Sequence, residues 1–508
     1  MRATPDTLGA AAAPPAAAAS ADKLDWTFHY VREDEVFPPA ISGTPWLQAP
    51  RWSAWNEPFK TTYADYVATQ ADKEAAVAAV RDLLARPDYL EGLDPAWRGA
   101  AKLHAATLPL AEFAAVIGNL RAARFGRDSA WRKMALFGAL DECRHTQIPL
   151  LLMHPFLSTD RQFDWTHLFY HSNNWVAIAA RHCFDELLLT ANPIEFAIGT
   201  NFVLETGFTN LQFVGLSSLA HGAHDKLFEK MVTSIQTDEA RHAQIGGPVL
   251  EVVLAEDPDY AQYLVDKWFW RSWLLFSIVT GFSMDYLTPL SARRASFREF
   301  MEEWVLDQFL SSLASYGLKR PWYWETFERA LLNYHHMVYL SAYTYRATVW
   351  FDMVMPGPAE RRWLAAKYPE TWDQYDGAWE HVAAQWQHCD PGVDFGVHGT
   401  AIPGFCHLCQ LVLCQGTPAH NDAVTHEHEG ARFIFCSEPC RRIFAHEPAR
   451  YAHHQDLVKR VLAGAAPGNL IAMLTRYFRL DYDTWGKDAY GGTYPWLGRA
   501  PKDSRGED

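Results

Sequence analysis

Two short segments of the chain repeat one pattern of acidic, basic and imidazole side chains. The segments Asp141–His145 (DECRH) and Asp238–His242 (DEARH) both read Asp-Glu-x-Arg-His and lie among apolar residues. On a helix, positions i and i+3 share a face, so the glutamate and the histidine of each copy point the same way. One Glu-x-x-His pair arises easily by chance, but two copies in the same five-residue frame indicate a common task.

Each copy is preceded by an isolated glutamate in apolar sequence. Glu112 lies in PLAEFAAV and Glu205 lies in FVLETGF, about 30 and 34 residues before Glu142 and Glu239. At 1.5 Å per residue, each gap accommodates an antiparallel helix and its turn, which brings the two glutamates to the same level. An unpaired buried carboxylate is costly, so these groups should be paired or should bind a metal.

The combined set predicts a metal centre between four helices, formed by Glu112, Glu142, His145, Glu205, Glu239 and His242. This is the ligand pattern of ferritin-like di-iron carboxylate proteins. Oxygen and imidazole ligands with open positions suit iron or manganese and oxygen chemistry. A set of buried ion pairs is the competing interpretation, which is disfavoured because such pairs rarely stabilise a fold.

Other polar residues are expected to support this centre. Asp141 and Asp238 would accept hydrogen bonds from the non-coordinating histidine nitrogens, with Arg144 and Arg241 balancing their charge; the alternative is that all four are surface charges. Further polar groups near the same level are Thr209, Asn210 and Gln236. The Thr209 hydroxyl would lie beside the metals or bond its own helix backbone, and the spacing leaves both open.

The elements that must position these residues are helices. Apolar residues recur at three- and four-residue spacing from about residue 66 to 388, as in a buried helical bundle. Long helices are predicted over 101–125, 128–153, 192–223, 225–256, 260–290, 296–318 and 326–350. The fold is therefore predicted to be mainly α, a ferritin-like di-iron bundle with extra helices and a small C-terminal cysteine-rich module. The expected divisions are a disordered leader (1–23), the ferritin-like di-iron domain (24–395), the cysteine-rich module (396–455) and a helical segment with a tail (456–508).

The cysteine-rich module predicts a second metal site. Cys406, Cys409, Cys436 and Cys440 form a Cys-x₂-Cys pair and a Cys-x₃-Cys pair, which fits structural zinc, with unliganded thiols as the alternative. His426 and His428 are competing ligands. The remaining cysteines are expected to be packing residues: Cys143, Cys183, Cys389 and Cys414.

Composition restricts the function further. The net charge of −15 argues against nucleic-acid binding, and the clustered cysteines favour a reducing compartment, the cytoplasm. No membrane span is expected, and no nicotinamide or flavin fingerprint is found. Other di-iron classes fit less well: a radical-generating reductase subunit would carry a tyrosine where Pro149 stands, a storage protein would be shorter, and a desaturase would lack the cysteine module.

The chain resembles the hydroxylase α subunits of bacterial multicomponent monooxygenases, in particular the toluene, alkene and phenol branch. The matching stretches are IGTNFVLETGFTNLQFVGL, SIQTDEARHAQIGGP, WRSWLLFSIVTG, MDYLTPL and KRPWYWETF. The resemblance covers about residues 24 to 490, and its cysteine region is similar to the YHS-type module of the family. It implies an enzyme that puts one atom of O₂ into an apolar hydrocarbon, by aromatic hydroxylation or alkene epoxidation, while the other atom leaves as water.

The same resemblance implies roles for individual residues. One iron would be held by Glu112, Glu142 and His145, and the other by Glu205, Glu239 and His242. Thr209 would assist proton delivery, and Asn210 and Gln236 would couple a pore to an effector protein. The implied substrate pocket comprises Leu108, Ala111, Ala115, Phe184, Leu188, Leu204 and Phe213. Leu204 stands where toluene-oxidising relatives often carry phenylalanine.

Because no cofactor fingerprint is found, electrons are expected to come from another chain, and the resemblance implies which partners are involved. Electrons from NADH would arrive through a separate reductase, a ferredoxin or both, and the oxygenase would also contain β and γ subunits and a small effector protein. A non-catalytic di-iron or metal-storage subunit is the alternative from a different functional class.

Overall fold

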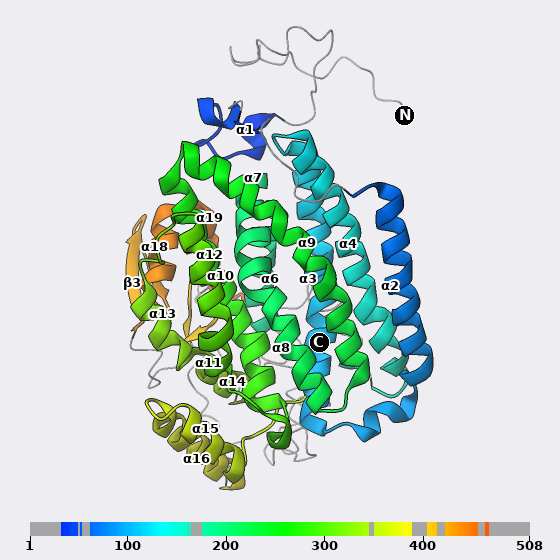
Figure 1. Cartoon of the computed structure of the whole chain (residues 1–508). Helices are drawn as coiled ribbons and strands as arrows, with labels where there is room; N and C mark the ends of the chain where they lie inside the picture. The colour runs from blue at the N-terminus through cyan, green and yellow to red at the C-terminus, as the bar shows by residue number, and fades with distance from the viewer. Residues whose placement is uncertain are drawn as a thin grey trace, which may run out of the picture.

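The computed structural model describes residues 32–48, 51–52, 61–160, 162–163, 175–344, 350–388, 404–413, 422–455 and 463–466. Helices make up most of this part of the chain, and a small module of short strands and helices lies at one edge (Figure 1). The predicted mainly α fold is confirmed. The predicted leader, most of the predicted C-terminal segment and the expected boundary near residue 395 lie outside the described residues.

Four long helical segments form the centre of the molecule. They are α3 (Pro95–Phe125), α4 (Ser129–Met153), α9 (Lys226–Glu256) and a composite of α7 (Pro193–Phe196), η9 (Ala197–Thr209) and α8 (Asn210–Gly222). Short turns join α3 to α4 and α8 to α9, so each pair is antiparallel. The two pairs contact each other through α4 and α9, which places the two Asp-Glu-x-Arg-His segments face to face.

Aspartate caps determine where three of these helices begin. Asp94, Asp128 and Asp225 each accept hydrogen bonds from backbone N–H groups in the first turns of α3, α4 and α9. Pro95 follows Asp94 and has no N–H that would be left unbonded at this position. Because each start is fixed, the level at which each helix presents its metal-binding side chains is fixed too.

The fourth segment departs from the regular helix predicted over 192–223. Its central part, η9, is a π-helix in which the N–H of Asn210 donates to the carbonyl of Glu205, five residues earlier. The Thr206 hydroxyl also donates to a carbonyl five residues back, that of Asn201, at 2.7 Å. Long π-helical stretches are rare and are found mostly at functional sites, and this one carries Glu205.

The composite helix and α9 approach each other closely at a glycine. A Cβ atom at Gly246 would lie 2.5 Å from the backbone nitrogen of Phe202, a distance that packed atoms do not tolerate. Glycine at this position therefore lets the helix of Glu239 and His242 lie against the helix of Glu205.

Further helices surround the centre. α2 (Tyr63–Leu84) packs on the outer side of α4 and α9, and α10 (Pro258–Phe282) packs on η9 (Figure 1). The remaining helical elements outside the cysteine module are α1 (Glu33–Val36), η3 (Pro45–Gln48), η5 (Pro87–Gly92), η6 (His154–Ser158), α6 (Trp175–Phe184), η8 (Asp185–Thr190), η10 (Ser283–Leu287), η11 (Leu290–Ala292), α11 (Phe297–Phe300), η12 (Met301–Leu306), α12 (Asp307–Ser315), α13 (Trp324–Leu331), α14 (Tyr334–Thr344), α15 (Pro358–Lys367) and α16 (Trp372–His388).

Two of these regions differ from the predicted helices. The predicted helix over 296–318 contains the π-helical segment η12, and the predicted helix over 326–350 is interrupted between Leu331 and Tyr334.

Among the described helices, α3 alone has the length and composition of a membrane span, whereas no such span was predicted. Most of its apolar stretch is buried inside the bundle, as expected for a helix that contributes a ligand from the core.

The C-terminal module contains two antiparallel hairpins and a short helical end. β1 (Gly404–Phe405) pairs with β2 (Val412–Leu413), and β3 (Val424–His428) pairs with β4 (Ala431–Phe435). α18 (Glu438–His446), α19 (Pro448–Tyr451) and η14 (Ala452–Gln455) follow. The second hairpin turns at Glu429 and Gly430, both with positive φ, as tight hairpin turns require. The module packs against α10.

Candidate metal centre

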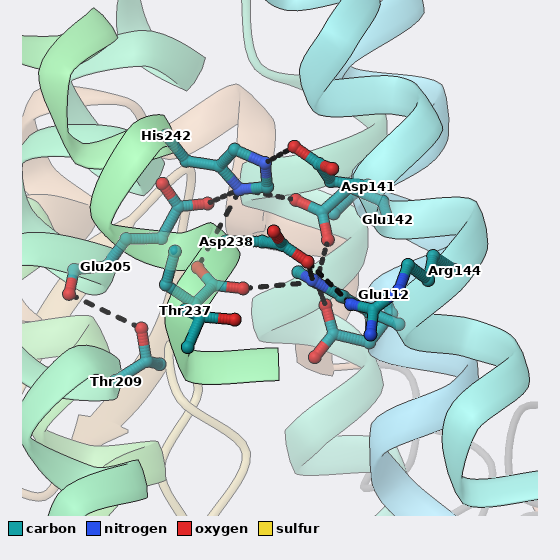
Figure 2. Close-up of polar contacts among 12 residues, drawn as sticks. Glu112, Asp141, Glu142, Arg144, Glu205, Thr209, Thr237, Asp238 and His242 are labelled. Carbon is teal, nitrogen blue, oxygen red and sulfur yellow. Dashed lines mark hydrogen bonds and ion pairs between the residues drawn. The ribbon is translucent and has the colours of Figure 1, made fainter. Parts of the chain in front are cut away.

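The six predicted metal ligands converge between the four central helices. Their ligand atoms form two overlapping groups, in each of which the atoms lie within 4.8 Å of one another: Glu112, Glu142, His145 and Glu239, and Glu142, Glu205 and His242. Figure 2 shows Glu112, Glu142, Glu205 and His242 pointing toward the same space from different helices. Five of the six side chains are buried, and Glu112 is partly buried.

Two of the glutamates face both histidines. His145 Nδ1 lies 3.0 Å from a Glu142 carboxylate oxygen and 3.2 Å from one of Glu239. His242 Nδ1 lies 3.3 Å from Glu142 and 3.8 Å from Glu239. The resemblance implied one triad of ligands per metal, and this division stays a prediction. The position of Glu142 and Glu239 suits ligands shared by two cations.

The other two glutamates lie at the outer sides. Each of them lies near one histidine of this centre. A carboxylate oxygen of Glu112 lies 3.8 Å from His145 Nδ1, and one of Glu205 lies 3.7 Å from His242 Nδ1. The second oxygen of Glu205 accepts a 2.7 Å hydrogen bond from the Asn201 side chain. Asn201 was not singled out from the sequence, although it precedes Glu205 by one helical turn.

The aspartates serve the histidines in a crosswise manner. Asp238 accepts from His145 Nε2 at 3.3 Å, and Asp141 accepts from His242 Nε2 at 3.0 Å, so each histidine depends on the other helix. The arginines follow the same exchange: Arg144 Nη1 donates to Asp238 at 2.6 Å, and Arg241 Nε donates to Asp141 at 3.1 Å. With Nε2–H donating to a carboxylate, Nδ1 is the nitrogen of each ring that faces the centre.

Helix α2 supplies another layer of contacts that the sequence analysis missed. Gln70 Nε2 donates to both Asp141 and Asp238 at 3.0 Å and so joins the two copies of the motif. Other contacts to this charged layer come from Tyr66, Lys73 and Glu74. These α2 residues follow helical spacing on one face, which is the signal that could have identified them.

Burial and charge set the proton affinity of the metal-free cluster. Burial raises the pKa of Glu112 to about 8 and that of Glu205 to about 7. Burial opposes ionisation of Glu142 as well, but the adjacent His242 and His145 hold its pKa below the usual range. The neighbouring carboxylates outweigh burial at both histidines and raise their pKa values. The cluster thus concentrates negative charge that protons or metal cations must neutralise.

The donor set fits a pair of metal ions. Four carboxylates meet at the centre of a water-poor bundle, and within the described part of the chain the buried His242 Nδ1 makes no hydrogen bond. A buried nitrogen that makes no hydrogen bond is costly unless another partner, such as a metal ion, satisfies it. Carboxylate oxygens with imidazole nitrogens suit iron, which would satisfy this nitrogen together with the acidic cluster.

A cavity of about 120 Å³ opens beside the carboxylates. Its wall includes Glu112, Glu142, Glu205 and Glu239. All seven residues predicted for the substrate pocket line it: Leu108, Ala111, Ala115, Phe184, Leu188, Leu204 and Phe213. Leu275, Ile278 and Trp350 also line the wall and were not predicted, because residues far along the chain reach the cavity only through helix packing. An apolar space thus borders the candidate metal centre.

The three additional polar candidates occupy different places. Thr209 lines the cavity, and its hydroxyl lies 3.5 Å from the backbone carbonyls of Leu204 and Glu205, the second of which is drawn in Figure 2. Gln236 Nε2 donates to Asn210 Oδ1 at 2.8 Å and connects α9 to α8. Neither Asn210 nor Gln236 belongs to the cavity wall.

The four predicted cysteines of the C-terminal module also converge. Cys406, Cys409, Cys436 and Cys440 are buried, with sulfur atoms within 4.8 Å of one another. Trp270 Nε1 donates to Cys440 Sγ at 3.1 Å, which ties the cluster to α10. These observations fit a closed thiolate site for a metal such as zinc.

The other predicted candidates near this module differ from the cluster. His426 and His428 are not part of it; both lie on β3 and contact the Phe444 ring. Cys183 is buried as predicted, whereas Cys143 is exposed, because its position on α4 faces away from the bundle. Cys389 and Cys414 lie outside the described residues.

A four-helix bundle that brings four glutamates and two histidines, including a Glu-x-x-His from each of two helices, to one buried point defines the ferritin-like di-iron carboxylate class. Comparison with known proteins narrows this class. The family described as Methane/Phenol/Alkene Hydroxylase matches residues 26–257. The oxygenase α subunit of the alkene monooxygenase system of Xanthobacter autotrophicus is 36% identical over 480 residues, which cover 94% of this chain and 95% of that protein.

Two phenol-oxidising relatives support membership in the same family. The oxygenase component DmpN of phenol 2-monooxygenase from Pseudomonas sp. is 28% identical over 90% of this chain and 88% of that protein. The crystal structure of xenon-pressurised phenol hydroxylase from Pseudomonas sp. OX1 superposes with a TM-score of 0.75 and 27% identity, covering 92% of this chain and 94% of that one. The chain therefore belongs to the methane/phenol/alkene hydroxylase family, as the α subunit of the oxygenase component of a multicomponent di-iron monooxygenase.

Proposed function

We propose that this monooxygenase subunit inserts one oxygen atom into a small apolar hydrocarbon held in the cavity beside Glu112, Glu142, Glu205 and Glu239. The observation that carries this proposal is the contact between an apolar cavity and the carboxylate cluster. The volume of about 120 Å³ approaches that of an apolar cavity of roughly 150 Å³ that stays dry and holds benzene. A short alkene or a single aromatic ring such as toluene or phenol matches this space.

Two iron ions per chain are the proposed cofactor. His145 and His242 would each contribute Nδ1 to the metals, and Glu112, Glu142, Glu205 and Glu239 would contribute carboxylate oxygens. Bound iron would supply the redox chemistry that activates O₂. Asp141 and Asp238 would hold each imidazole in the tautomer that presents Nδ1 to the metal.

The protein's own contribution is a dry and shaped cavity. Leu108, Phe184 and Phe213 would hold the hydrocarbon near the centre and keep water away from the reacting atoms. Thr209 lies at the wall of the same cavity, and its hydroxyl bonds only weakly to its own helix. This hydroxyl can turn to hold a proton beside Glu205, which makes Thr209 the candidate for proton delivery.

The remaining assignments concern assembly. Electrons would come from NADH through a reductase, with or without a ferredoxin, because the sequence carries no nicotinamide or flavin fingerprint. β and γ subunits and a small effector protein would complete the system in the cytoplasm, with Asn210 and Gln236 joining the effector surface to the centre. The module at 396–455 would be a YHS-like unit with one structural zinc, set between the hydroxylase domain (24–395) and the segment at 456–508.

Iron analysis and a single-turnover assay test this function. Purified oxygenase should contain about two irons per α subunit. Chemically reduced protein exposed to O₂ should convert propene to its epoxide or toluene and phenol to hydroxylated products. Isoprene should be tested in parallel, because its size also fits the cavity.

The alternative is an α subunit that stores metal without catalysis. This alternative would be supported if fully iron-loaded and reduced oxygenase, supplied with its effector protein, formed no product from propene, isoprene, toluene or phenol. Product from any of them would exclude it.

A further inference from the structure

Three histidines from distant parts of the sequence meet outside the iron centre and the cysteine cluster. His182 lies near the end of α6, and His453 and His454 lie on η14 of the C-terminal module. The ring of His454 lies 4.2 Å from that of His182 and 4.4 Å from that of His453, between centroids. One ring nitrogen from each residue lies within 4.8 Å of the others.

The orientation of His454 leaves a lone pair available. Its Nδ1 lies 2.9 Å from the backbone carbonyl oxygen of His407. A carbonyl can only accept a hydrogen bond, so Nδ1 carries the proton and Nε2 carries the lone pair. An imidazole held through its other nitrogen by a backbone carbonyl is the usual arrangement of a metal-binding histidine.

The surrounding charges are nearly balanced. Arg271 and Arg181 are fixed cations that act on His182, and Arg271 is paired with Glu186 at 2.7 Å. Lys267 and Arg450 next to this pair are matched by Glu195 and Glu447. Burial together with the neighbouring cations and imidazoles lowers the pKa of His182 and His454, so both rings are neutral at pH 7 and each keeps one nitrogen lone pair, the kind of donor that binds a cation.

We propose that His182, His453 and His454 form a binding site for a divalent transition-metal ion that fastens the C-terminal module to α6. Three imidazoles suit zinc, nickel or copper better than magnesium or calcium, which require oxygen ligands. His453 is exposed, so metal can enter from solvent and water can fill a fourth position.

The location gives the site a structural consequence. Val176, Ala180 and Phe184 of the same helix α6 line the cavity beside the iron centre. A metal that joins His182 to η14 therefore anchors one wall of that cavity to the C-terminal module. The inference does not depend on which hydrocarbon the enzyme oxidises.

Zinc titration of the assembled oxygenase, with its iron and thiolate sites already filled, tests the proposal. Isothermal titration calorimetry with metal analysis should show one additional zinc per α subunit. H453A should weaken this binding at least tenfold, because it removes the exposed ligand without disturbing the buried core. H154A removes another exposed histidine and should bind the additional zinc as the unaltered protein does. Iron content should be the same in both variants, which shows that H453A removes the additional site and not the fold.

A second measurement locates the ion. Crystals of the oxygenase soaked in zinc should give an anomalous difference peak between the rings of His182, His453 and His454. The proposal is overturned if no peak appears there, if the protein binds no additional zinc, or if H453A binds zinc as tightly as H154A. In those cases the three rings are a packing cluster.

Discussion

The carboxylate–histidine centre and the cysteine cluster are two buried groups of metal-binding side chains with opposite surroundings. The carboxylate centre borders a cavity of about 120 Å³, whereas the cavity at Cys409 measures only about 10 Å³, too small for any substrate. Metal sites that perform chemistry keep an open position, and structural sites are closed. The difference suits the proposed functions, in which the carboxylate centre would accept a reactant and the cysteine cluster would hold a structural ion.

The two groups also differ in what supports them. The thiolates have Trp270 and Tyr334 as neighbours and lie within a short stretch of chain. The carboxylate centre draws on helices separated by more than a hundred residues and adds a layer of charged partners from α2, α4 and α9. A centre that changes charge during reaction needs such partners, whereas a permanent structural ion needs only its ligands.

The largest effect should come from removing a carboxylate that faces both histidines. Glu239→Ala should abolish iron loading and lower single-turnover yield by at least about a thousandfold, because the electrostatic environment of the reaction is lost. Iron per chain and product yield measure this. Glu251→Ala, an exposed change on the same helix, should leave both intact. Iron binding retained by E239A would remove Glu239 from the proposed ligand set.

Loss of one cysteine should instead affect stability. Cys436→Ser should release the proposed zinc and destabilise the C-terminal module by about 4 kcal/mol or more, as expected when a structural metal is lost. Zinc content and denaturant unfolding followed by tryptophan fluorescence measure the effect. Iron content should change much less than zinc content. An unaltered unfolding midpoint would argue that the four thiols are unliganded.

A substitution in the charged layer should have an intermediate effect. Asp141→Asn removes the carboxylate that His242 and Arg241 contact, and it should weaken iron binding roughly 10- to 100-fold. Competition with an iron chelator gives the affinity. Tyr66→Phe removes only one 2.7 Å hydrogen bond to the same aspartate and should have a smaller effect. Equal affinities for D141N and the unaltered protein would contradict the crosswise support of the histidines.

Iron affinity should rise with pH. Burial raises the pKa of Glu112 to about 8 and of Glu205 to about 7, so both carboxyls hold protons below neutrality and must release them to bind iron. Affinity should increase up to about tenfold per pH unit for each proton released. The rise should continue above pH 8, because the neighbouring carboxylates also raise the pKa values of His145 and His242, and each imidazole must lose a proton to bind iron. The stability of the metal-free protein should change in the opposite sense. The pKa values of Glu112 and Glu205 are higher in the folded than in the unfolded protein, so protonation of these two carboxyls favours the folded state. Their contribution to the free energy of unfolding is complete below the unfolded-state pKa of a glutamate and is lost as pH rises toward 8.

The smallest effect should be a change in substrate preference. Leu204→Phe narrows the cavity and should disfavour a ring relative to a short alkene by about tenfold, as expected for a change of a few carbon atoms in an apolar pocket. Competition between toluene and propene in one reaction measures the ratio. Leu211→Phe, outside the cavity wall, serves as the control. An unchanged ratio in L204F would place the substrate elsewhere.

Local periodicity was sufficient to predict that Glu142 and His145, or Glu239 and His242, share a helix face whatever the tertiary packing. The spacing of Glu112 and Glu205 from these residues, which fits an antiparallel helix and its turn, predicted the other two members of the cluster. The resemblance supplied the cavity residues. The hydrogen bond from His145 on α4 to Asp238 on α9 could not be predicted, because it depends on how each helix is rotated about its own axis. The π-helical turns of η9 and the contributions of α2 and α10 were missed for a related reason: they arise from contacts between helices far apart in sequence.

The crosswise hydrogen bonds have a consequence for protein engineering. Each imidazole takes its acceptor from the opposite helix, and Gln70 joins both acceptors. A single helical hairpin transplanted into another scaffold would therefore carry a histidine of undefined tautomer beside an aspartate with no imidazole to orient. The two copies of the motif support each other, so a redesign must transfer both helical hairpins together.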